Sequence, residues 1–477
     1  MSSHKNLLHC IIMIAITFGI GLLPPLGGDI TPLGMKVLGV FIGVLYGWSF
    51  LSFFWTSCFG MLALALTGYD TIDKILAAGF SNTMVLQMIC IFTLVVYFID
   101  NGLVEVAVGF FVNRKITHGR PFVLMFMLFF ASALAMMLGL GFASVLFCWA
   151  IMYKLFDSLG YKKGNLLVTY MIFGAVMSAN VATSVFPFNP FPIMMSGFTA
   201  AVGHTISFVP WIGWTFCYVV VLYIIYTLVG KYILRLDVKA FFEKAEEIKR
   251  IYIVKTMTKQ QKFALAMLCL FLLICLIPFF LPEGTIKAFL GQFGLIGSTF
   301  LIMTITSIIR IDEKPITNWV DNAKKGIDWN MIIMFVATTP IANALESADA
   351  GILSTVFSHV LPVLSKMPGD MFIWAVVIFM IIVTQFVHNI VLMVALSPTL
   401  FSLAASMGNV NLSLLAACII ISATAAFLTP GASATSAAAF ANVEYVETKQ
   451  VYKIALCVIL SVIIALAIMY PVAKFVF

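Results

Sequence analysis

Two short runs of polar side chains interrupt apolar stretches near the C-terminal end of the sequence. The first run covers 384–390 and reads Thr-Gln-Phe-Val-His-Asn-Ile, and the second covers 425–436 and is rich in Ala, Ser and Thr. Hydroxyl, amide and freed carbonyl oxygens suit a small hard cation, whereas the N–H groups at the start of a helix suit an anion. The two runs are therefore candidates for binding ions or small charged solutes.

Close packing of helices is the alternative explanation, because Ser, Thr, Ala and Gly also let helices in a bilayer approach one another. For the Ala/Ser-rich stretch 422–438, which contains the second run, that alternative stays open. His388 and Asn389 differ, because a polar pair within an apolar arm is costly unless it has a purpose. We therefore expect these two residues to belong to the binding site.

Residue patterns typical of enzymes are absent from the sequence. None of the six His residues is paired with Glu at helical spacing, and neither a GxSxG elbow nor a phosphate-binding loop occurs. The nine Cys residues lie within apolar runs and form no CxxC pair, as expected for buried thiols. We predict that the protein is not an enzyme, that it holds no cofactor and that ATP does not drive it.

The composition indicates a membrane protein. Of the 477 residues, 62% are hydrophobic and 10% are charged, and the mean hydropathy is +1.10. Soluble domains carry about 25% charged residues, and a bilayer-spanning helix needs about 20 mostly apolar residues. We therefore expect an all-α polytopic membrane protein with about 11 transmembrane helices. The predicted spans are 7–25, 35–50, 52–68, 84–100, 164–186, 208–233, 261–282, 289–309, 329–346, 411–429 and 450–475.

Two longer apolar stretches, 121–156 and 371–407, each contain two arms around a break. The first break is 138–141 (Leu-Gly-Leu-Gly), and the second is 387–389 (Val-His-Asn). An apolar hairpin with a small or polar tip is typical of a re-entrant pair of half-helices, whose tip must be satisfied by protein or by a watery cavity. We therefore predict two re-entrant hairpins.

Basic residues concentrate in the loops that this count places on one side of the membrane. Those loops include 114–120, 153–163 and 231–262, the last with nine basic and four acidic residues. Loops on the other side, such as 346–349, are poor in Lys and Arg. The positive-inside rule then puts the N-terminus in the cytoplasm and the C-terminus outside the cytoplasmic (inner) membrane. The segment 234–260 is expected to be a solvated linker that binds no nucleic acid.

The two halves of the chain carry similar motifs in the same order. A turn at 79–82 and another at 326–329 each precede an apolar helix, a short amphipathic stretch, a hairpin and a helix that breaks. Since the first hairpin starts in the cytoplasm and the second outside, the repeats have inverted topology. Inverted repeats with broken helices are typical of secondary transporters, whose binding site lies near the midplane of the bilayer.

With these features the sequence resembles the divalent anion/sodium symporter family of the ion-transporter superfamily. The resemblance rests on the order of hairpin, broken helix and inverted repeat, and on the spacing of Thr384, Asn389 and Pro398. Members carry a Ser-Asn-Thr motif at each hairpin tip and a Thr-Pro-like motif in each broken helix, and they work as dimers with an elevator-type transport domain. Here the second tip reads His-Asn-Ile at 388–390, and the first reads Gly-Leu-Gly at 139–141.

The resemblance implies site residues and domains. The implied ligands of a sodium ion are Thr384, Asn389 and Ala432, and only one strong sodium site is implied because the first tip has lost its Asn. The implied substrate-binding residues are His388, Asn389, Ser433, Ala434, Asn180 and Gly141. The implied division is 1–120 and 261–370 as scaffold, 121–233 and 371–477 as transport domain, and 234–260 as cytoplasmic linker.

The leading hypothesis is a secondary active transporter, a homodimer that couples sodium to symport of a small organic anion, a carboxylate, by an elevator mechanism. A substrate with one anionic end is favoured, because Leu140 and Phe142 would face a second carboxylate. The glycine N–H groups of the first tip still leave a dicarboxylate open. Two alternatives also stay open: a proton-coupled transporter or cation/proton exchanger in which His388 titrates, and a membrane-embedded enzyme or scaffold.

Cysteine accessibility, measured in a variant that lacks the native cysteines, tests the first hairpin. Arg120→Cys and Lys154→Cys should react with a membrane-impermeant maleimide from the same side, because they flank a stretch that does not cross the bilayer. Labelling of the two cysteines from opposite sides would show that 121–156 crosses the membrane.

Overall fold

The computed structural model describes residues 3–112, 115–117, 119–139, 143–243, 256–282, 284–352, 354–355, 358, 366–442 and 444–477. Within this part of the chain the protein is built from helices, and the strands are β1 (Arg310–Ile311) and β2 (Lys314–Pro315), which pair antiparallel. The prediction of an all-α polytopic membrane protein is confirmed.

Every predicted span contains a helix. The helices are α1 (Ser3–Gly19), α2 (Pro32–Phe50), α3 (Phe53–Leu66), α5 (Thr83–Asp100), α9 (Leu166–Ala182), α11 (Phe208–Leu228), α14 (Lys259–Phe280), α15 (Thr285–Ile308), α17 (Trp329–Glu346), α21 (Leu412–Thr424) and α23 (Thr448–Val476). Seven described helices are long and apolar enough to cross a membrane, judged by length and composition. The predicted spans 164–186 and 411–429 form shorter helices, α9 and α21, because the chain unwinds before these stretches end.

Both long apolar stretches form a pair of helices, as predicted. The pairs are α7 (Pro121–Met137) with α8 (Ala143–Leu159), and α19 (Gly369–Val383) with α20 (Asn389–Met407), and the two arms of each pair contact each other. In the first tip Gly139 has a φ of +83°, which glycine adopts readily, and residues 140–142 lie outside the described part of the chain. That both hairpins are re-entrant stays a prediction.

The remaining described helices are short. They are α4 (Ile72–Phe80), α6 (Leu103–Val112), α10 (Pro190–Ala201), α12 (Lys239–Glu243), α16 (Trp319–Gly326) and α22 (Ala434–Ala441), with the single turns η1 (Ile20–Leu22), η2 (Lys115–Thr117), η3 (Val229–Ile233) and η4 (Pro430–Ala432). The second halves of the two broken helices are α10 and α22, and they follow the breaks at 183–189 and 425–433, which are not α-helical.

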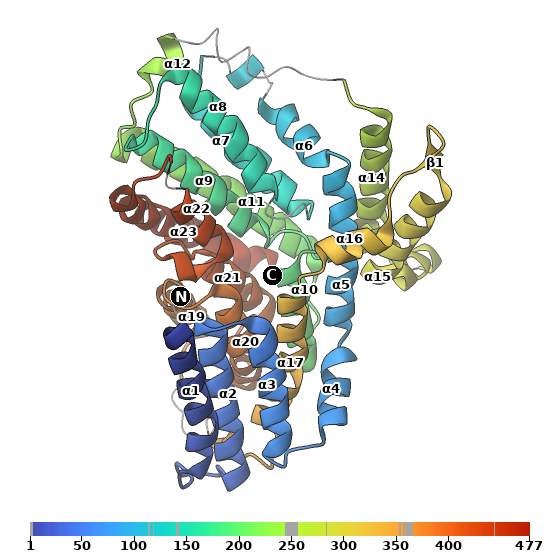
Figure 1. Ribbon diagram of the computed structural model, residues 1–477, viewed down its shortest axis with the longest axis vertical. Helices are drawn as coiled ribbons and strands as arrows, with labels where there is room; N and C mark the ends of the chain where they lie inside the picture. The colour runs from blue at the N-terminus through green and yellow to red at the C-terminus, as the bar shows by residue number, and fades with distance from the viewer. Residues whose placement is uncertain are drawn as a thin grey trace.

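The two repeats pack against each other reciprocally (Figure 1). In the first, α4 leads through the cap residue Asn82 into the 18-residue α5, and in the second α16 leads through Asp328 into the 18-residue α17. The helix α4 contacts α17, and α16 contacts α5. These contacts are close, because a Cβ atom at Gly79 or Gly326 would lie 2.2 or 2.3 Å from a carbonyl oxygen of the opposite helix. Such an exchange is expected of an inverted repeat.

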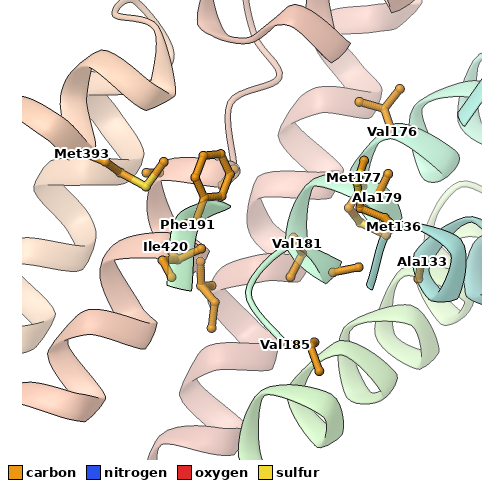
Figure 2. Close-up of a cluster of buried hydrophobic side chains, with 14 of the residues drawn as sticks. Ala133, Met136, Val176, Met177, Ala179, Val181, Val185, Phe191, Met393 and Ile420 are labelled. Carbon is orange, nitrogen blue, oxygen red and sulfur yellow. The ribbon is translucent and has the colours of Figure 1, made fainter. Parts of the chain in front are cut away.

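The exchange continues around the two breaks. Helix α10 of the first repeat contacts α20 and α21 of the second, while α22 contacts α9 of the first. Figure 2 shows apolar side chains of this region, among them Met177 of α9, Phe191 of α10, Met393 of α20 and Ile420 of α21. The two repeats therefore share one hydrophobic core.

Contacts at the helix ends agree with the predicted topology. Two segments placed on the cytoplasmic side meet where Lys325 and Asp100 form an ion pair at 3.0 Å. Two segments placed outside meet where the Thr31 hydroxyl donates to the Asp349 carbonyl at 2.6 Å. Which end faces the cytoplasm stays a prediction.

The reciprocal packing predicts that Gly79→Ala and Gly326→Ala each destabilise the protein. The added Cβ would collide with backbone, and overpacking of this kind costs about 1–3 kcal/mol, so the midpoint of thermal unfolding in detergent should fall. The matched control is Gly213→Ala on α11, because an added Cβ there meets nothing within 4 Å. Equal midpoints for all three variants would contradict this account.

Candidate substrate and ion site

Gln385 joins the tip of the second hairpin to the break in the second broken helix. Its side-chain N–H groups donate to the carbonyls of Ala425 at 2.7 Å and Ile381 at 2.8 Å. Its Oε1 atom accepts from the backbone N–H groups of Phe427 at 3.1 Å and Leu428 at 3.0 Å. One buried side chain therefore satisfies four backbone groups, three of them in the break.

Two threonine hydroxyls flank this amide. Thr384 is buried at the end of α19 and donates to the carbonyl of Ala423 in the last turn of α21, at 2.8 Å. Thr429 lies in the break and donates to the Gln385 carbonyl at 2.6 Å. Because each hydroxyl proton is used on a carbonyl, the oxygen lone pairs remain available to a further donor or a cation. The predicted cation ligand Thr384 thus contacts the broken helix directly.

His388 and Asn389 lie together at the start of α20. His388 is the N-cap, its Nδ1 accepts from the Ile390 N–H at 3.4 Å, and its ring lies edge-on to Phe53 of α3, with ring centres 5.3 Å apart. Asn389 is 5% exposed, and its Oδ1 accepts the same N–H at 2.8 Å. Both side chains therefore lie at the positive end of the α20 dipole, where an anion is stabilised.

A chain of hydroxyls and one amide connects the second break to the first broken helix. Ser433, the N-cap of α22, lies 3.3 Å from the Ala426 carbonyl oxygen and 3.0 Å from the hydroxyl of Thr435. Thr435 lies 2.8 Å from Oδ1 of Asn180 in the last turn of α9. Two predicted residues, Ser433 and Asn180, are thus brought together by Thr435, which lies in the predicted run 425–436 but was given no role of its own.

The other predicted residues offer only backbone groups. Ala432 is buried at the end of η4, and its N–H donates to the Thr429 carbonyl at 3.2 Å. Ala434 is exposed and begins α22. Gly141 lies outside the described residues.

The first repeat satisfies its break differently. The side chain of Asn189, the residue before α10, donates to the carbonyl of the last residue of α7 at 3.1 Å. Trp211 of α11 donates to the Ser184 carbonyl at 2.7 Å. The first turn of α10 contains Pro190 and Pro192, which have no N–H group, so α10 offers fewer donors to an anion than α20 or α22. Anion binding is therefore favoured in the second repeat.

The side chains around both breaks are polar without formal charge. Among the residues that the structure describes, no Asp, Glu, Lys, Arg or His side chain is buried, and the buried polar groups belong to Ser, Thr, Asn, Gln, Tyr and Trp. Neutral oxygens and N–H groups of this kind suit reversible binding of a monovalent cation and an anion.

The sequence analysis gave no individual role to several residues of this geometry, although Gln385 and Thr435 lie inside its two polar runs. Gln385 had a usable signal, because a glutamine inside an apolar arm needs hydrogen-bond partners when it is buried. Thr435 and Asn189 had no such signal, because the partners of both are distant in the sequence.

Two interlocked repeats, each with a hairpin tied to a broken helix, are the architecture of a secondary transporter. The family model described as the sodium:sulfate symporter transmembrane region matches residues 4–475, and the chain belongs to this family. Comparison with curated proteins finds none that matches. The chain is therefore a multi-pass membrane protein of the anion symporter type, and the resemblance to the divalent anion/sodium symporter family is confirmed.

Replacing Gln385 with Leu should strongly destabilise the protein. Leucine leaves the four backbone groups without their partner, and each unsatisfied buried group costs about 1–3 kcal/mol. The midpoint of thermal unfolding in detergent should therefore fall well below that of the control Gln292→Leu, because Gln292 is exposed on α15. Equal midpoints for the two variants would show that the break does not depend on Gln385.

Proposed function

We propose that the protein is a secondary active symporter that couples sodium to the movement of a small carboxylate. The observation that carries the proposal is the network in which Thr384 and Gln385 hold the break at 425–433. Backbone that has left a helix within an apolar bundle offers carbonyl oxygens to a cation and N–H groups to an anion. Membership of the family supports anion symport, and the organic anion and the coupling ion are our proposal.

For the sodium ion we propose ligands from Thr384, Asn389 and the Ala432 carbonyl. The Thr384 hydroxyl proton is used on a carbonyl, so the lone pairs of its oxygen are free. The Oδ1 atom of Asn389 accepts one N–H and keeps a second lone pair. Since Asn189 and Trp211 occupy the first break, we propose a single strong sodium site.

For the anion we propose binding between the starts of α20 and α22, at His388, Asn389, Ser433 and Ala434, with the Ala434 N–H among the donors. Asn180 would contribute from the first repeat, and Gly141 would add a backbone N–H. A substrate with one carboxylate and a less polar other end suits this asymmetry, because apolar side chains surround the first broken helix (Figure 2). Burying a second carboxylate against such side chains would cost roughly several kcal/mol of binding free energy.

For transport we propose an elevator movement in which 121–233 and 371–477 move together. The contacts of α10 with α20 and α21, and of α22 with α9, support their motion as one body. The segments 1–120 and 261–370 would form the static scaffold. We propose a homodimer in the cytoplasmic membrane on the family resemblance.

Uptake into proteoliposomes tests this function. Labelled succinate and labelled monomethyl succinate, which differ by one charge, are offered with an inward sodium gradient, with an inward proton gradient or with neither. Sodium-driven uptake that favours monomethyl succinate is the expected result. Uptake that follows only the proton gradient would overturn sodium coupling. Uptake of labelled sulfate in place of both carboxylates would make an inorganic anion the substrate.

Asn389→Ala should remove the sodium dependence of uptake, because it deletes one of few oxygen ligands. In the parent chain the Hill coefficient for sodium should be near one. Asn165→Ala is the matched control: Asn165 caps α9 through Oδ1, which accepts from the Leu167 N–H at 2.9 Å. The control loses a cap worth about 1 kcal/mol but no ion ligand. Sodium dependence that survives equally in both variants, or a parent Hill coefficient near two, would contradict the single site.

A further inference from the structure

The polar chain that crosses between the repeats contains one atom without a partner. The chain runs from the Ala426 carbonyl through Ser433 and Thr435 to Asn180, with separations of 3.3, 3.0 and 2.8 Å. Ser433 and Asn180 are 4% and 6% exposed, and Nδ2 of Asn180 has no hydrogen-bond partner. A buried amide with an unpaired end costs free energy unless a ligand pairs with it.

Two oxygen atoms 3.0 Å apart, as in Ser433 and Thr435, repel each other unless a proton lies between them. Two mutually exclusive arrangements of this chain place a proton there. The Ser433 hydroxyl has one proton and two lone pairs, and the Ser436 N–H occupies one lone pair at 3.1 Å. In the first arrangement Ser433 donates to Ala426, Thr435 donates to Ser433, and the amide of Asn180 turns its NH2 group to Thr435. In the second arrangement Ser433 donates to Thr435, Thr435 donates to Oδ1 of Asn180, and the NH2 group is unpaired.

Of these two arrangements, only the second leaves Ser433 a lone pair for a cation. In the first, both lone pairs of Ser433 accept hydrogen bonds, and its proton points at the Ala426 carbonyl. In the second, Ser433 keeps a free lone pair, and the Ala426 carbonyl is released from the serine proton. A positive charge beside these two oxygens also repels the hydroxyl proton toward Thr435. The cation therefore sets the direction of every hydrogen bond in the chain.

We propose that this chain couples the cation to the anion. The single sodium ion proposed at Thr384, Asn389 and the Ala432 carbonyl would take the Ser433 hydroxyl, from the next residue in the chain, and the Ala426 carbonyl beside it as further ligands. Sodium bound in this way selects the second arrangement, and the NH2 group of Asn180 then donates to the substrate carboxylate. Without sodium, the chain takes the first arrangement, in which the amide oxygen of Asn180 faces the position of the substrate carboxylate. This oxygen repels an anion. The inference rests on the proposed sodium-coupled function and adds to it a route of coupling and a donor from the first repeat.

Thr435→Val breaks the chain, because valine has nearly the same shape and no hydroxyl. Binding of labelled monomethyl succinate to the purified full chain is measured with saturating sodium and without sodium, and the ratio of the two dissociation constants is the coupling. Sodium should tighten binding to the parent chain by about tenfold or more, and the ratio in Thr435→Val should fall to within about twofold of one. Thr435→Ser, which keeps the hydroxyl, should retain the coupling.

Thr215→Val is the matched control, because it removes the same hydroxyl group from a buried threonine outside the chain. The Thr215 hydroxyl donates to carbonyls of its own helix, α11. Its coupling ratio should equal that of the parent chain. A parent chain on which sodium has no effect would overturn the proposed function and this inference with it. A parent chain with strong coupling that Thr435→Val retains would overturn the inference alone.

Asn180→Asp tests the chain from its other end, and it provides an independent test if Thr435→Val does not fold. Aspartate keeps the shape and the acceptor for Thr435 but has no NH2 group, so binding of monomethyl succinate in sodium should weaken by about tenfold or more. The thermal shift that sodium alone produces should persist. Unchanged anion affinity in Asn180→Asp would overturn the assignment of Asn180 as a donor.

Discussion

A backbone group that leaves a helix inside an apolar bundle finds no water, so a side chain must replace its lost hydrogen bond. Both broken helices of this protein are organised by that requirement. In the second repeat the Gln385 amide reaches from the hairpin into the break, and in the first the Asn189 amide reaches from the break to the hairpin. Each break is therefore tied to its own hairpin, and a movement of one requires a movement of the other.

The repeats meet this requirement with different chemistry, and the difference determines where ions can bind. In the first repeat an indole N–H and an asparagine close the break, and α10 then starts with two prolines in its first turn. In the second, the hydroxyl oxygens of Thr384 and Thr429 lie at the break and keep lone pairs free, and Ser433 keeps one only when it donates to Thr435. An inverted repeat could provide two equivalent cation sites. In this protein the candidate oxygen ligands for a cation lie in the second repeat. The second repeat therefore suits the binding of one cation and one anionic group.

The sequence was sufficient to predict the long helices and the two helix pairs, because a run of apolar residues is a property of the chain alone. Helix α10 was not predicted, since Pro190 and Pro192 resemble an interruption, although proline is compatible with the first turn of a helix. The partners in the site were also not predictable. Asn180 and Thr435 are 255 residues apart, and no local pattern indicates which buried polar groups meet when two repeats interlock.

In the proposed site, which is made of neutral groups, the binding of a cation and the binding of an anion depend on each other. A buried charge is costly unless an opposite charge or several hydrogen bonds accompany it, and no charged side chain is buried among the described residues. A carboxylate alone would be an uncompensated negative charge and a sodium ion alone an uncompensated positive one, so each ion lowers the cost of burying the other. This attraction between the two ions does not determine which of them binds first. The chain from Ser433 through Thr435 to Asn180 would supply an order, because it offers the anion a donor only after the cation has turned the hydroxyl protons.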